Sequence, residues 1–251
     1  MRERAERRSQ EIALQSQESL NRGLITACIS DEKYFPVEEE NLDLMARPTP
    51  VDYYGNEKEW KRLGQKHGGK ESYVISELDE SDKFSSEYYD CIGLFAVGTE
   101  GNKNISILTH QDAHARETNI GDKLAVRSQS EAYEHDLRVT LRALKDRSES
   151  GTIDVVIFGG YDTSPETYVA SVKLVARVSQ EVLGVDPVVI AGPKGTGSGD
   201  TAVECDTQRR RIFIAQANNR LAYHQRNDPK YWNRDASFKA SEVEQKMADW
   251  H

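Results

Sequence analysis

The chain has 251 residues, a formal net charge of −9 and a mean hydropathy of −0.71. An acidic balance of this size disfavours nucleic acids and anionic membrane surfaces as partners. No apolar run approaches the roughly 20 residues that a membrane-spanning helix needs, and no apolar segment follows the basic first residues, as it would in a Sec-type signal peptide. We expect a cytoplasmic protein without a membrane span, with signal-less secretion as the alternative.

Apolar periodicity is confined to the middle of the chain. This predicts a polar N-terminal extension over 1–72, an α/β domain over 73–216 and a polar C-terminal extension over 217–251. The first extension mixes acidic runs such as VEEENLD with turn-forming residues, and we expect it to be irregular.

The first elements of the central domain are predicted to be strands. The apolar runs CIGLFAVG and NISILT, joined by the loop TEGNKN, predict a β-hairpin. KLAVR predicts another short strand. In SEAYEHDLRVTLRALKDR apolar residues recur at helical spacing, which predicts a helix with a buried face of Tyr133, Leu137, Leu141 and Leu144.

Strands and a second helix follow. TIDVVIFGG predicts a buried strand closed by two glycines, and Pro165 and Gly184 are typical of the first residue and the stop of a helix. DPVVIAGP and RRRIFIAQ predict two more strands, with Arg209–Arg211 on a solvated face or a sheet edge. This order predicts an α/β fold, a mixed β-sheet sandwich with two helices on one face.

The three cysteines, Cys28, Cys91 and Cys205, lie far apart, and no C-x-x-C pair is present. The spacing indicates neither a zinc site nor a disulfide framework, and a reducing compartment is the default setting. We expect Cys205 to be a buried strand residue and Cys28 to be exposed in the polar lead-in. We expect neither a metal nor an organic cofactor.

Cys91 and His110 are the candidate catalytic pair. Cys91 begins the first strand of the predicted hairpin and His110 ends the second, so pairing of the strands would bring both to one end of the sheet. Thiol catalysis needs such a base to generate the thiolate. The alternative is a buried thiol beside an incidental histidine. His114 lies four residues after His110 without a third metal ligand at suitable spacing, which favours a solvated loop histidine over a metal site.

The order of these segments resembles the chemoreceptor glutamine deamidase (CheD) family, which shares its catalytic core with toxin deamidases such as the cytotoxic necrotizing factors. The resemblance covers about residues 85 to 216 and rests on DCIGLFAVGTEGNKNISILTHQDA, the VVIFGG strand with its following helix, and GTGSGDTAVECDTQRRRIFIAQ. It implies that Cys91 is the nucleophile and His110 the general base. Ser85, with Ser86 as the neighbouring possibility, would be the hydroxyl residue that completes the site. The loop GPKGTGSGD, which lacks the ending of a phosphate-binding loop, would help to wall it.

The function implied by the resemblance is hydrolysis of a glutamine side chain of a protein substrate to glutamate, with release of ammonia. An imidazolium at His110 would lower the pKa of the Cys91 thiol. Two alternatives stay open: a non-enzymatic protein-binding module on the same fold, and another Cys-His thiol hydrolase such as a protease or a transglutaminase. Tyr89-Asp90 stands where that family has Gly-Ser, and the sequence does not identify the substrate.

Overall fold

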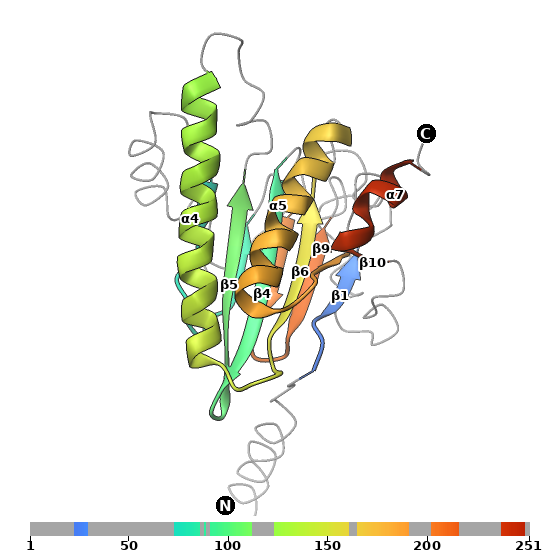
Figure 1. The fold of residues 1–251 in the computed structure, drawn as a ribbon. Helices are drawn as coiled ribbons and strands as arrows, with labels where there is room; N and C mark the ends of the chain where they lie inside the picture. Colours follow the sequence, from blue (N-terminus) through green and yellow to red (C-terminus); the bar gives the residue numbers. More distant parts are fainter. Residues whose placement is uncertain are drawn as a thin grey trace, which may run out of the picture.

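The computed structural model describes residues 23–29, 73–85, 88, 91–111, 123–160, 165–190, 202–215 and 237–248. Over these ranges the chain is a mixed α/β structure of two sheets with helices on one face (Figure 1). The strands are β1 (Thr26–Ile29), β2 (Tyr73–Ile75), β3 (Lys83–Ser85), β4 (Ile92–Glu100), β5 (Lys103–Gln111), β6 (Asp154–Gly159), β7 (Val188–Val189), β8 (Ala202–Asp206), β9 (Arg211–Ala215) and β10 (Phe238–Lys239). The helices are α4 (Lys123–Arg147), α5 (Pro165–Leu183), the short 3-10 helix η3 (Ala240–Glu242) and α7 (Val243–Ala248).

The strands form a large and a small sheet. The large sheet has the order β10-β7-β6-β4-β5-β2 and the small sheet the order β1-β9-β8-β3. In the large sheet β4 pairs antiparallel with β5 and β6, whereas β6 pairs parallel with β7. The predicted mixed sheet is therefore confirmed at the level of a mixed α/β sandwich.

Both faces of the large sheet are covered, which explains why β4 and β6 read as continuous apolar runs rather than as alternating patterns. On one face the strands pack against α4 and α5, through residues such as Leu94, Ile107 and Ile157. On the other face they pack against the small sheet, through residues such as Phe95, Leu108 and Val156. In Figure 1 α4 runs alongside β5, and α5 lies in front of β4 beside β6.

The predicted hairpin is confirmed, with longer strands and a tighter turn than the sequence suggested. β4 and β5 pair from Ile92 with Gln111 to Glu100 with Lys103, so only two residues form the turn. Gly101 takes the first of these positions with φ 62°, a conformation that favours glycine in two-residue hairpin turns.

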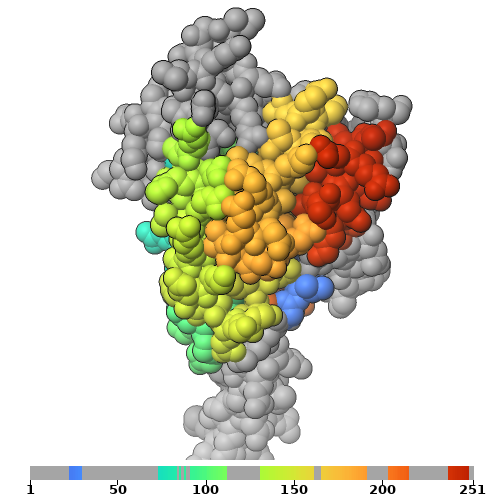
Figure 2. Space-filling view, in the orientation of Figure 1, coloured from blue at the N-terminus to red at the C-terminus, as the bar shows by residue number. Residues whose placement is uncertain are grey.

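Both predicted helices are confirmed. Tyr133, Leu137, Leu141 and Leu144 are all buried against the sheet. In α5, Pro165 is the first residue, and Gly184 ends the helix with φ 74° while its N–H donates to the Gln180 carbonyl. Figure 2 shows the two helices side by side on one face, next to the C-terminal segment.

The strand predicted at KLAVR is wrong, because these residues form the first turns of α4. Three apolar residues between two cations do not distinguish a strand from part of a helix by periodicity alone, and here the segment continues into a long helix.

The folded unit extends beyond the predicted limits at 73 and 216. From the N-terminal side, β1 pairs parallel with β9, and this buries Cys28, which was expected to be exposed. From the C-terminal side, β10 pairs with β7 and α7 packs beside α5. Ser241 donates a hydrogen bond of 2.7 Å to Asp186, which fixes the segment before α7.

Arg210 is buried, although the sequence predicted that Arg209–Arg211 would lie on a solvated face or a sheet edge. It is fully buried with φ 53°, and its guanidinium donates to the carbonyl oxygens of Gly23, Val97 and Thr152. Asp154, which interacts electrostatically with Arg210, accepts a hydrogen bond of 2.5 Å from the Ile25 amide. The buried arginine therefore links β1 to the large sheet, and only its neighbours Arg209 and Arg211 are exposed as predicted.

Among the described helices, none combines the length and the apolar character that crossing a membrane requires.

Candidate active site

Cys91 lies at the end of the large sheet, directly before β4. Its carbonyl oxygen accepts a hydrogen bond of 2.8 Å from the Gly160 amide, which extends the pairing of β4 with β6 by one residue. Gly159 has φ 90°, and a Cβ atom there would come within 2.4 Å of the Cys91 oxygen. Gly159, the last residue of β6, and Gly160 directly after it thus allow the close backbone approach that holds Cys91 in place.

Cys91 is the one cysteine of the three that is partly exposed, whereas Cys28 and Cys205 are buried. Its side chain packs against the cluster between the two sheets. Burial raises the pKa of Cys205 well above its ordinary value, which keeps that thiol protonated. Cys205 is therefore the buried strand thiol that the sequence predicted, and Cys91 is the accessible one.

His110 lies on β5 opposite Gly93 and is fully buried. Because side chains alternate along a strand, Gly93 faces the same side as Cys91, two residues away, and so does its partner His110. Residues that are offset by one such step across an antiparallel pair have backbones about 7–8 Å apart, within reach of longer side chains. The hairpin therefore places Cys91 and His110 as diagonal neighbours on the inner face of the large sheet.

Ser85 approaches the same histidine from the small sheet. It ends β3, where it pairs with Val203 of β8, and its side chain is buried. Its Oγ lies 3.0 Å from Nδ1 of His110. The structure thus brings Ser85 and His110 together and places Cys91 on the same face.

Tyr88 is a residue of this site that the sequence reasoning missed. Its ring stacks on the imidazole of His110, with ring centroids 4.0 Å apart and planes 19° apart, and its hydroxyl donates to the Thr109 carbonyl at 3.0 Å. The ring also fills the space beside Gly93 together with Phe158, which meets Tyr88 edge-on. An aromatic residue between Ser85 and Cys91 in the polar stretch SSEYYD was the available signal, although it does not distinguish Tyr88 from Tyr89.

Burial sets the protonation state of the histidine. Desolvation lowers the pKa of His110 to about 3, so the ring is neutral at neutral pH. The expected imidazolium is therefore not the resting state. The ring is neutral, with a lone pair on one nitrogen, and burial makes it a weaker base than a solvated imidazole. When Nδ1 carries its hydrogen and donates to Ser85, the lone pair is on Nε2.

Three other sequence candidates, Ser86, His114 and the loop GPKGTGSGD, lie outside the described residues. Within the ranges that are described, no group of three or more His, Cys, Asp or Glu side chains gathers in a way that could hold a metal ion.

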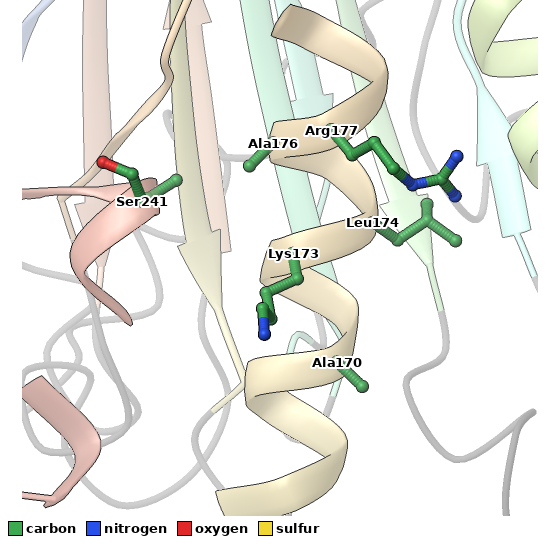
Figure 3. Close-up of a pocket in the computed structure, with 7 residues that line it drawn as sticks. Ala170, Lys173, Leu174, Ala176, Arg177 and Ser241 are labelled. Carbon is green, nitrogen blue, oxygen red and sulfur yellow. The ribbon is translucent and has the colours of Figure 1, made fainter. Parts of the chain in front are cut away.

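An open groove of about 530 Å³ lies elsewhere on the molecule, between α5 and η3 (Figure 3). In Figure 3 Lys173 projects from α5 on the side of Ser241, whereas Arg177, which also lines the groove, extends on the other side of the helix. Both cations have carboxylate partners, since Lys173 pairs with Glu244 at 2.6 Å and Arg177 pairs with Glu134 at 2.8 Å. The groove is lined by residues of the helical layer, so it is separate from the site between the sheets.

No family model matches the chain, and a search of curated proteins gave no match. The resemblance to the CheD family therefore stays a prediction from the quoted motifs, and the chemistry has to be argued from the geometry of the site.

Proposed function

We propose that the protein is a thiol-dependent amidohydrolase that converts a glutamine side chain of a protein substrate to glutamate. The observation that supports this most directly is the 3.0 Å contact between Ser85 Oγ and His110 Nδ1, on the face that also carries Cys91. A nucleophile, a base and a residue that orients the base are the elements of thiol catalysis. Ser85 ends β3, His110 lies on β5, and Cys91 directly precedes β4.

In the proposed reaction His110 acts as the base. Its neutral ring takes the proton of the Cys91 thiol as sulfur attacks the carbonyl carbon of the glutamine side chain. The C–N bond then breaks, the departing nitrogen takes that proton and leaves as ammonia, and a thioester remains. Water, deprotonated by the same imidazole, attacks the thioester, and the C–S bond breaks to give glutamate and the free thiol. No oxidant, reductant or cofactor is needed to balance these steps.

Ser85 acts on the histidine in this proposal and does not contact the reacting bond. By accepting the Nδ1 hydrogen it favours the tautomer in which Nε2 can take a proton. A hydroxyl with this role agrees with the assignment that the resemblance to glutamine deamidases implies for position 85.

The proposed partner is a protein that presents an accessible glutamine, and the proposed location is the cytoplasm. The net charge of −9 supports a protein rather than a nucleic acid as the partner. A buried imidazole and a partly exposed thiol require that the substrate side chain enter the sheet end from outside, as a slender glutamine side chain would.

The test is ammonia release from a glutamine-rich protein such as casein, with mass spectrometry of the product. We expect glutamine to become glutamate without peptide cleavage and without crosslinks to added amines. Cys91→Ala should abolish the reaction, and Cys205→Ala should retain it. Cleavage or crosslinking would instead indicate a protease or a transglutaminase. Binding of a substrate without turnover, unaffected by Cys91→Ala, would indicate a binding module and would overturn the proposal.

A further inference from the structure

We propose that Tyr88 is a positioning residue for His110, which fixes the plane of the imidazole and shields it from water so that the ring stays in the form that accepts a proton. The effect on catalysis rests on the proposed function, whereas the effect on the orientation and the pKa of His110 depends only on the stacking of the two rings. It assigns a role to a residue that neither the motifs nor the resemblance singled out.

The stacking geometry carries the argument. A centroid separation of 4.0 Å with planes 19° apart means that one full face of His110 is covered by Tyr88. Both residues are buried, and Ser85 occupies the Nδ1 edge of the imidazole. A ring that is covered on a face and held at one nitrogen cannot rotate about its side-chain bonds without breaking both contacts.

The tyrosine is itself held rigidly. Its hydroxyl donates to the carbonyl of Thr109, the residue directly before His110, so the stacking ring is anchored to the same strand that it shields. Phe158 supports it edge-on at a centroid distance of 5.0 Å. Gly93 is required for this arrangement, because a Cβ atom there would lie 2.2 Å from Phe158 and 2.9 Å from Tyr88.

The electrostatic surroundings of the stack do not favour a charged imidazole. The titratable groups that interact with Tyr88 are Cys91 beside β4, Cys205 on β8 and Tyr133 on α4. Burial raises the pKa of both Tyr88 and Cys205 well above their ordinary values, so neither supplies a negative charge near neutral pH. Burial is the cause of the lowered pKa of His110, and Tyr88 contributes to that burial by covering one face of the ring.

The experiment is a histidine titration by NMR in the full chain, with His110→Gln to assign its signal among the 6 histidines. Tyr88→Phe retains the covering face and should leave the titration of His110 as in the wild type. Tyr88→Leu opens that face and should raise the pKa of His110 by about one unit or more, because water then reaches the ring. Leu141→Ala is the control, since it removes buried volume on the opposite face of the sheet without touching the stack.

Activity provides the second readout. In Tyr88→Leu we expect kcat to fall about tenfold at neutral pH while KM changes little, because the imidazole is no longer held in one plane, and Tyr88→Phe should retain the wild-type kcat. If Tyr88→Leu does not fold, Tyr88→Met fills similar volume without a flat ring and serves in its place. A His110 titration that is the same in the wild type and in the leucine or methionine variant overturns the inference. Absence of ammonia release by the wild type, with the titration shift present, overturns the proposed function and leaves the positioning role standing.

Discussion

Ser85 Oγ lies 3.0 Å from Nδ1 of His110, although the two residues belong to different sheets. The small sheet contributes Ser85 through its edge strand β3, and the large sheet contributes His110 through β5. The contact therefore reports on the docking of one sheet against the other. A substitution that shifts one sheet relative to the other should therefore change the distance between Ser85 Oγ and His110 Nδ1.

Ser85→Ala should lower kcat about tenfold or less while KM stays nearly constant, because a hydrogen bond of this kind contributes about 1 kcal/mol. Ser85→Thr keeps the hydroxyl and should retain most of the activity. Ser179→Ala is the matched control, since Ser179 is buried on α5 and its hydroxyl has no hydrogen-bond partner. Equal activity of Ser85→Ala and the wild type would remove Ser85 from the site.

Cys91→Ala should abolish ammonia release and change the free energy of unfolding by less than about 1 kcal/mol, because the thiol is only partly buried. Cys205→Ala should show the opposite behaviour, with activity retained and a larger loss of stability, because Cys205 is packed in the cluster between the sheets. Urea unfolding and ammonia release, measured on both variants, separate a catalytic thiol from a structural one.

Gly159→Ala should both destabilise the protein and lower kcat. The residue has φ 90°, and its new Cβ would meet the Cys91 carbonyl oxygen at 2.4 Å, so the backbone of the nucleophile has to move. Gly101→Ala is the control because Gly101 also has a positive φ, 62°, but nothing lies within 4 Å of the added atom. We expect about 1 kcal/mol of destabilisation and unchanged activity for Gly101→Ala, with a clearly larger loss for Gly159→Ala.

Acid should destabilise the protein through His110. Its pKa is about 3 in the folded chain and 6.5 when solvated, so the unfolded chain binds an extra proton between these values. The contribution of neutral His110 to the free energy of unfolding is therefore fully present above pH 6.5. It falls as the pH decreases towards 3, by up to about 1.4 kcal/mol per pH unit.

The measurement is the free energy of unfolding of the wild type and of His110→Gln at pH 7 and pH 5. Carboxylates titrate equally in both proteins, so the difference between the two pH slopes isolates the histidine. We expect the slope to be shallower for His110→Gln. Parallel slopes would show that His110 is reached by water in the folded chain.

The sequence predicted the parts of the fold that rest on local patterns. The hairpin, the apolar face of α4 and the limits of α5 each follow from a period, a turn or a terminal residue within one segment. The proximity of Cys91 and His110 on one face follows from the hairpin itself. The resemblance implied a hydroxyl at Ser85, but the hydrogen bond to His110 depends on how the two sheets pack.

What the sequence did not predict depends on contacts between distant segments. Four residues of β1 carry too little apolar pattern to stand out in a polar lead-in, and they form a strand because β9 offers an edge. Arg210 reads as a surface charge because burial of a guanidinium requires acceptors that only the folded chain provides. Tyr88 stands out only through its stacking on His110, which lies 22 residues later on β5, so no local pattern marks it.

The buried guanidinium of Arg210 has a consequence for the order of folding. It joins Gly23 to a residue 187 positions later, and β1 pairs in parallel with β9, the last strand of the small sheet along the chain. β1 precedes the other described strands along the chain but takes its place late in folding, because its docking site does not exist until β8 and β9 have formed. Closure of such a long loop is slow compared with formation of the β4–β5 hairpin. A ribosome-bound chain that stops short of residue 210 would hold a finished hairpin, with Cys91 and His110 already on one face of it, while β1 still lacks its partner strand β9.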